Sequence, residues 1–157
     1  MSDDLHERDV LAWSINQAAL LRRVAAGERV NTVDWVNVVE EIEDLGISEL
    51  NAVRSYLRQI LVHLLKLHAW PGHDAARHWR SEVIAFQSDA AQRFAPSMRQ
   101  RIELEKIHAR AVRQVEPLYQ DGVPVPPPPA SCPVTLDQVL NASCRELEAA
   151  FAATPGA

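Results

Sequence analysis

Apolar residues recur every three or four positions through most of this 157-residue chain. That spacing puts them on one side of an α-helix, and no stretch shows the alternation of apolar and polar residues that is typical of a strand. The longest such pattern runs from Trp35 to Leu67 and is almost unbroken across Gly46. The sequence therefore predicts an all-α fold, a bundle of five or six helices in a single domain over residues 1–157.

Capping and turn residues indicate where the helices begin and end. The predicted helices cover, approximately, residues 10–26, 34–45, 48–70, 74–94, 96–115 and 135–151. Gly27 and Pro71–Gly72 are stop signals, and Asp74 can cap the fourth helix. Thr135 and Gln138 have the spacing of a capping box for the last helix. Because the apolar pattern continues between them, the second and third helices could also be one kinked helix.

One segment is dominated by proline. Seven of the ten prolines lie between Pro117 and Pro133, including the run Pro126–Pro129. Proline disrupts helix interiors and favours the polyproline II conformation. Residues 117–134 are therefore predicted to form an extended strap before the last helix.

The composition of the chain argues against several classes of protein. Apolar residues make up 47% of the chain, which is too much for a disordered protein, and the net charge of −5 argues against a dedicated nucleic-acid binder. Residues 2–9 are polar, no apolar segment reaches 18 residues, and neither cysteine belongs to a Cys-x-x-Cys pair. We therefore expect no signal peptide, no membrane-spanning helix and no zinc knuckle, but a cytoplasmic protein with reduced thiols.

The net charge conceals a segregation along the chain. Residues 1–50 carry 11 acidic and 4 basic side chains, whereas residues 51–113 carry 5 acidic and 11 basic ones. An acidic block followed by a basic block can pair within a fold or form a binding surface.

Several short motifs follow one another in a recognisable order. They are Asp9-x-x-x-Trp13, Asp34 before Glu40-Glu41-Ile42-Glu43 and Leu45-Gly46, then His63-Leu64-Leu65-Lys66, Trp79-Arg80 and Cys132-Pro133-Val134-Thr135-Leu136. Over nearly the whole chain this order resembles the bacterial Domain of Unknown Function 29 family. The resemblance implies an α-helical, bacterial, cytoplasmic protein and implies no activity. The chain departs from the family pattern at His6, Glu82 and Gln87, where Tyr, Thr and Arg are usual.

Three polar residues lie at the edges of apolar helix faces. Glu41, His63 and Arg80 each border the apolar side of a different predicted helix, so they can meet in a seam between helices. One interpretation is a buried polar network that fixes the register of the helices. The other is a pocket in which a carboxylate base, an imidazole and an anion-binding guanidinium serve a small hydrolase or a metal-dependent enzyme.

A Glu-x-x-His pair, Glu105 and His108, occurs in the predicted fifth helix. Di-metal helical bundles use two such pairs with two further carboxylates, and this chain has one pair. These residues are weak candidates for metal ligands, and we predict neither a metal nor a cofactor.

The predicted fifth helix also has a basic face. Its members are Arg99, Lys106, Arg110 and Arg113. Such a face can be solvated, can bind another protein or can contact nucleic-acid phosphates. No aromatic residue alternates with these cations, which argues against binding of single-stranded nucleic acid.

These features together favour a non-enzymatic protein-interaction module. No catalytic motif is present, the charge is segregated, and a Pro-rich strap is suited to docking in a groove. The expected partner is another protein or a second copy of the chain, as in a dimer. Contact with nucleic acid is the less favoured alternative, and contact with a membrane is not expected.

Overall fold

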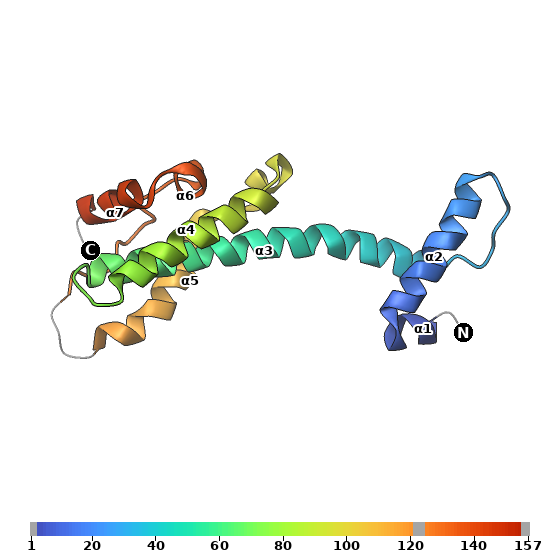
Figure 1. The fold of residues 1–157 in the computed structure, drawn as a ribbon, viewed down its shortest axis with the longest axis horizontal. Helices are drawn as coiled ribbons and strands as arrows, with labels where there is room; N and C mark the ends of the chain where they lie inside the picture. Colours follow the sequence, from blue (N-terminus) through green and yellow to red (C-terminus); the bar gives the residue numbers. More distant parts are fainter. Residues whose placement is uncertain (1–2, 121–124, 155–157) are drawn as a thin grey trace. The chain divides into compact units, whose positions relative to one another are not determined.

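The computed structural model describes residues 3–120 and 125–154 and contains only helices and loops there (Figure 1). The helices are α1 (Asp3–Arg8), α2 (Val10–Ala25), α3 (Trp35–Ala69), α4 (Ala76–Arg93), the 3-10 helix η1 (Pro96–Arg101), α5 (Leu104–Val115), the 3-10 helix η2 (Glu116–Gln120), α6 (Leu136–Asn141) and α7 (Cys144–Ala153). No strand occurs in this described part of the chain, which confirms the predicted all-α class.

The residues of the second and third predicted helices form one continuous helix, α3, of 35 residues. Gly46 lies inside it because a single glycine costs a helix only about 1 kcal/mol, and the apolar residues from Leu50 onward are buried in the C-terminal core. The last predicted helix is instead two helices, α6 and α7. Ser143 separates them because its side chain accepts a hydrogen bond from the backbone of Glu146, while the Glu146 carboxylate accepts one from the backbone of Ser143. This second capping box lies next to the predicted one at Thr135, which is present.

The fifth predicted helix is wrong at its start. Residues 96–101 form η1, and Ile102 is extended before α5 begins at Leu104. The break allows Met98, Ile102 and Ile107 all to reach the core. Arg54 Nη2 donates to the carbonyl of Arg101 at 2.6 Å, which satisfies one acceptor freed by the break.

The cap predicted for the fourth helix is also wrong, because α4 begins after Ala75 and has no side-chain cap. The backbone N–H of Ala75 donates to Nδ1 of His73 at 3.0 Å instead. Asp74 therefore does not take the role that its position suggested.

The Pro-rich strap is only partly extended. It begins in η2, because the fixed φ of Pro117 suits the first turn of a helix. Residues 121–124 of the predicted strap lie outside the described residues. Beyond them the strap contacts its own chain: His68 Nε2 lies 3.3 Å from the carbonyl oxygen of Pro127, and the backbone N–H of Cys132 donates to the Glu105 carboxylate at 3.0 Å.

The chain divides into an N-terminal unit, residues 1–48, and a C-terminal unit, residues 49–157, and α3 contributes to both. In the N-terminal unit, α1 and α2 lie beside the first turns of α3 (Figure 1). Its small core is built on Trp13, Val33 and Val38. Helix α2 ends as predicted at Gly27, whose φ of 86° is the left-handed conformation that glycine adopts readily.

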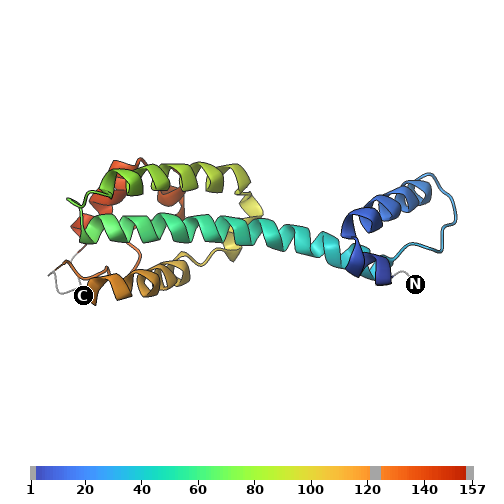
Figure 2. The same cartoon turned by 60° about the horizontal axis from the view of Figure 1, so that its bottom comes forward.

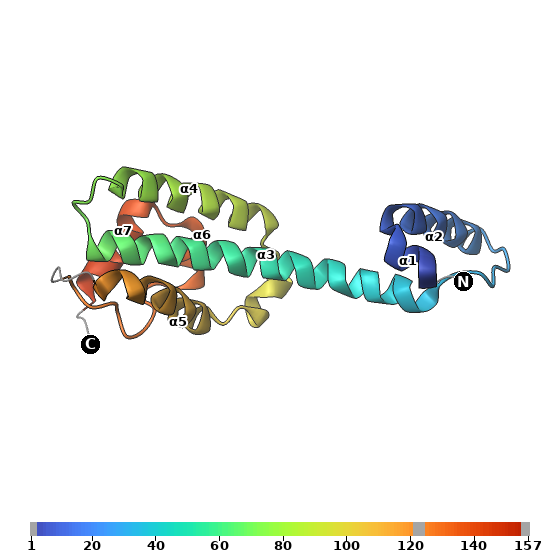
Figure 3. The same cartoon turned by 90° about the horizontal axis from the view of Figure 1, so that it is seen from below.

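The C-terminal unit has the larger core. Figures 2 and 3 show α4 and α5 on either side of the second half of α3, with α6 and α7 on a third side. Leu57, Ile60 and Phe151 are fully buried there. Gln87 of α4 donates to the carbonyls of Val139 and Ala142, both at 2.8 Å, and so ties α4 to the end of α6. No helix of the described residues is long and apolar enough to cross a membrane.

Candidate functional site

A line of apolar residues follows one side of the first half of α3. Trp35, Val39, Ile42 and Gly46 are spaced by four, three and four residues, which keeps them on one face of the helix. The three large side chains are 52%, 51% and 65% exposed. A methyl group added at Gly46 would meet no atom within 4 Å. We call these four residues the N-terminal stripe.

The same side of α3 is buried in the second half of the helix. Each residue of the N-terminal stripe has a counterpart 18 residues later, about five helical turns on, and therefore at the same angle around the axis. The counterparts, in order, are Val53, Leu57, Ile60 and Leu64, and none is more than 1% exposed. A face that is packed into the core of the C-terminal unit is thus uncovered within the N-terminal unit.

Apolar exposure is concentrated in the N-terminal unit as a whole. Of the eleven large apolar side chains that are exposed in the described residues, nine lie there. Besides the stripe they are Val10, Leu11, Ile15, Val36, Leu45 and Ile47. Scattered exposed apolar residues are normal, whereas Trp35, Val39 and Ile42 share one face of α3.

A buried polar group holds this unit together from inside. The Asp34 carboxylate accepts from Trp13 Nε1 at 3.1 Å and from Asn37 Nδ2 at 2.7 Å. The backbone N–H of Asp34 donates to Gln17 Oε1 at 2.9 Å. Asp9 caps α2 by accepting from the backbone of Ala12. Among the residues that contribute to the family resemblance, Asp9 therefore caps α2, and Trp13 and Asp34 join α2 to the start of α3.

The first residue of the predicted seam, Glu41, belongs to the N-terminal unit. Its carboxylate lies 2.6 Å from Nε2 of His6, and the His6 ring packs edge-on against Trp13. His6 is one of the positions that depart from the family pattern, and it is the residue that pairs with Glu41.

The other two seam residues, His63 and Arg80, belong to the C-terminal unit and bond to different partners there. His63 Nδ1 lies 2.7 Å from the carbonyl oxygen of Gln59, and burial lowers the pKa of this half-buried imidazole. Arg80 makes a bidentate ion pair with Glu148 of α7, with a shortest distance of 2.9 Å, and this hydrogen bonding raises the pKa of the guanidinium. A seam that joins Glu41, His63 and Arg80 stays a prediction.

The two residues of the Glu-x-x-His pair of α5 differ in exposure to solvent. Glu105 is exposed and accepts from the backbone of Cys132. His108 is only 2% exposed, and its Nε2 has no hydrogen-bond partner among the described residues. Burial lowers the pKa of His108. Within the described residues, no group of three or more His, Cys, Asp or Glu side chains is arranged to hold a metal ion.

The predicted basic face is divided between two elements. Arg99 lies in η1 rather than in α5 and pairs with Asp137 at 2.8 Å. Lys106 of α5 pairs with Glu103. Arg110 and Arg113 are exposed and have no ion pair with any described residue.

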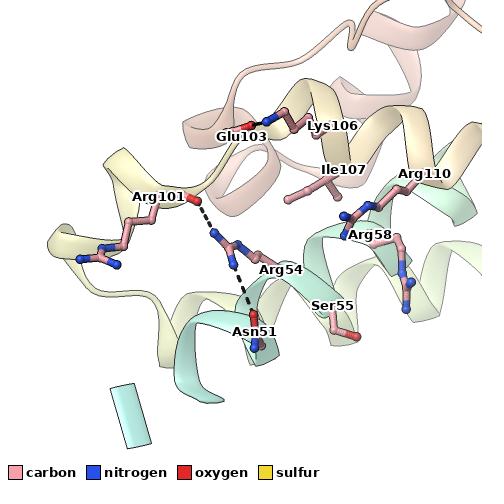
Figure 4. Close-up of a pocket in the computed structure, with 9 residues that line it drawn as sticks. All are labelled: Asn51, Arg54, Ser55, Arg58, Arg101, Glu103, Lys106, Ile107 and Arg110. Atoms are coloured by element: carbon pink, nitrogen blue, oxygen red, sulfur yellow. Dashed lines mark hydrogen bonds and ion pairs between the residues drawn. The ribbon is translucent and has the colours of Figure 1, made fainter. Parts of the chain in front are cut away.

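A cavity of about 420 Å³ lies where α3 meets η1 and α5 (Figure 4). Its lining includes five cations from three elements: Arg54 and Arg58 from α3, Arg101 from η1, and Lys106 and Arg110 from α5. Arg54 and Arg58 escaped prediction from the sequence, although their four-residue spacing matches that of Lys106 and Arg110. A helical wheel describes one helix at a time, whereas this cavity forms where two helices cross.

Comparisons with known proteins identify the kind of chain this is. The sequence model of a family described as Domain of unknown function DUF29 matches residues 5–144. The crystal structure of an α-helical protein of unknown function from Rhodospirillum rubrum ATCC 11170 is similar, with 28% sequence identity and a TM-score of 0.66. That similarity covers 94% of this chain and 95% of the other chain. A comparison with curated proteins finds no match.

Proposed function

This chain belongs to the DUF29 family, and we propose that it works as a protein-interaction module that pairs with a second copy of itself through the N-terminal stripe of α3. The observation that carries the proposal is the exposure of Trp35, Val39 and Ile42 on the side of α3 that is buried five turns later. We propose the bacterial cytoplasm as its setting.

The energetics favour covering this face. Burying a large apolar side chain completely contributes about 1.5–3 kcal/mol, and the three large residues of the stripe are all at least half exposed. Val36 and Leu45 flank the stripe and are still more exposed. An interface centred on these residues has an apolar core of the kind that homodimers use.

The spacing of the stripe suits a partner helix. Intervals of four, three and four residues form the seam that two helices bury when they pack at a shallow angle. Gly46 lies on that seam in open space, so a partner backbone can approach closely there. A two-fold axis brings the same surface of two copies together, and a stripe of this kind is complementary to itself.

An acidic residue beside the stripe predicts how salt acts on this pairing. Glu43 is exposed at the edge of the stripe and would lie at the rim, where two copies bring like charges together, whereas Glu40 and Asp44 lie on the other side of α3. Salt screens this repulsion, so self-association becomes tighter as ionic strength rises. A basic protein partner would instead bind more weakly at high salt.

Sedimentation equilibrium of the full chain over a range of concentrations and salt tests the proposal. We expect a monomer–dimer equilibrium, and we expect Val39→Glu and Ile42→Glu to abolish it while helical content, and the melting temperature of the dilute monomer, are retained. Glu40→Gln, on the acidic side of the same helix, is the matched control and should leave the dimer intact. A wild-type chain that is monomeric at every concentration, or a dimer that survives both stripe substitutions, overturns the proposal.

A further inference from the structure

The cavity between α3 and α5 belongs to the C-terminal unit and is independent of the self-association proposed above. Five of its lining side chains are cationic, and Glu103 is the one carboxylate among the described lining residues. Lys106 pairs with Glu103, and this hydrogen bond is the main cause that lowers the pKa of the Glu103 carboxyl. The four arginines have no ion pair with any described residue.

Arg58 has a donor that nothing in the described structure satisfies. Its Nε is shielded from solvent and has no hydrogen-bond partner among the described residues. A shielded donor on a charged group is costly when it is left without an acceptor. Arg58 also lines the cavity, so an anion bound there would lie beside a guanidinium that has no acceptor at Nε among the described residues.

The placement of the cations also lowers the stability of the protein when no anion is bound. Arg54 and Arg58 are four residues apart on α3, as are Lys106 and Arg110 on α5, and like charges at this spacing destabilise a helix. Figure 4 shows the two pairs coming from helices on either side of the cavity. Such a concentration of positive charge is expected where a multivalent anion binds.

The chemistry of the lining selects phosphate. Planar guanidinium groups bind phosphate oxygens through two parallel hydrogen bonds, and several arginines in one concave site suit more than one phosphate group. The volume of about 420 Å³ falls within the range of small-molecule sites. None of the described lining residues is aromatic, so stacking of nucleic-acid bases has no platform there.

We propose that this cavity binds a small molecule that carries at least two phosphate groups, with Arg58 and Arg110 as its main ligands. Arg54 is held in place by its hydrogen bonds to the Arg101 carbonyl and to Asn51, so it presents its charge at a fixed position. Ile107 is buried beside these charges and gives the cavity an apolar wall for the remainder of the ligand.

Isothermal titration calorimetry of the full chain with pyrophosphate, at low and at physiological ionic strength, tests this proposal. We expect one saturable site per chain, with inorganic phosphate binding clearly more weakly. Arg58→Gln and Arg110→Gln should each weaken binding roughly ten- to a hundredfold, as expected for the loss of charge-assisted hydrogen bonds. Arg113→Gln, on the same helix but outside the cavity lining, is the matched control and should change the affinity by less than about twofold.

Thermal unfolding separates binding from a structural effect. Because Arg58→Gln removes an unsatisfied donor, its melting temperature without ligand should be no lower than that of the wild type, while its stabilisation by pyrophosphate is lost. The exposed Arg110→Gln variant gives a second result should Arg58→Gln fail to fold. Absence of pyrophosphate binding, equal binding by the variants, or a DNA oligonucleotide that binds more tightly than pyrophosphate and depends on Arg113 would overturn the proposal.

Discussion

The two halves of α3 carry the same pattern with opposite outcomes. Val39 and Leu57 lie 18 residues apart, as do Ile42 and Ile60, so each pair points to the same side of the helix. In the C-terminal unit that side is sealed by other helices, whereas in the N-terminal unit it is more than half exposed. An apolar helix face predicts that something covers it, but whether the cover comes from the same chain is decided by the rest of the fold.

The two units also differ in whether their buried polar groups have hydrogen-bond partners. In the N-terminal unit, the carboxylate of Asp34 accepts a hydrogen bond from Trp13 and its backbone N–H donates one to Gln17. In the C-terminal unit, His108 is buried with Nε2 unpartnered among the described residues. The small N-terminal core thus depends on hydrogen bonds, whereas the larger C-terminal core tolerates an unsatisfied group.

The largest expected difference comes from truncating equivalent isoleucines in the two halves of α3. Ile60→Ala should lower the free energy of unfolding by about 2–5 kcal/mol, because it leaves a cavity in a fully packed core. Ile42→Ala should change it by less than about 0.5 kcal/mol in the monomer, because the side chain is 65% exposed. Urea denaturation at low protein concentration measures both. Equal losses would show that the N-terminal stripe is covered within the chain.

A second substitution tests the polar core of the N-terminal unit. Asp34→Ala should destabilise this unit by about 2–3 kcal/mol, because it leaves Trp13 Nε1 buried without its acceptor. Faster proteolysis within residues 1–48 and a shift in Trp13 fluorescence would report the change. Asp44→Ala, an exposed position on α3, is the control and should have little effect. A stable unit after Asp34→Ala would mean that its apolar contacts suffice.

Buried His108 is expected to make the C-terminal unit sensitive to acid. Burial lowers the pKa of His108 in the folded state, against a weaker opposing effect of the Glu105 charge, while the unfolded chain titrates near 6.5. Below that pH the unfolded chain takes up a proton that the folded one does not. Stability is therefore present above about pH 6.5 and is lost as the pH falls, by at most about 1.4 kcal/mol per pH unit for this group. Half-buried His63 shifts in the same direction.

Urea titrations from pH 7.5 to pH 5, followed by the loss of helical circular dichroism, measure this dependence. His108→Leu should flatten it, because leucine takes up no proton and fills similar space. An unchanged pH dependence in this variant would assign the acid sensitivity to His63 or to the carboxylates.

Helix class and several helix ends could be read from the sequence because they depend on local chemistry. Gly27 ends α2, and Thr135 with Gln138 begins α6, as their spacing predicts. No glycine or proline marks the break between η1 and α5 in the sequence, since the break arises where Ile102 and Ile107 both reach the core. The break before α7 did have a local signal, Ser143 with Glu146, which the apolar pattern concealed.

Candidate site residues were predictable only within single helices. Helical spacing places Lys106 and Arg110 on one face, but their closeness to Arg54 and Arg58 depends on how α5 crosses α3. Arg80 was recognised at the edge of an apolar face, but its partner Glu148 lies 68 residues further along the chain. Pairings between helices follow from tertiary packing, which residue spacing does not contain.

The smallest expected effect comes from Gly46→Ala, which should act in opposite directions on the stability of the monomer and on the affinity of the dimer. Gly46→Ala should stabilise the monomer by about 0.5–1 kcal/mol, because alanine has the higher helix propensity and its methyl group meets no atom within 4 Å. The same methyl group would obstruct the close approach of a second helix, so the dimer should dissociate more readily. Ser48→Ala, on another side of α3, is the control that raises helix propensity without touching the stripe. Thermal unfolding and sedimentation on both variants measure the two effects, and a Gly46→Ala dimer as tight as the wild type would show that the partner helix does not pass over Gly46.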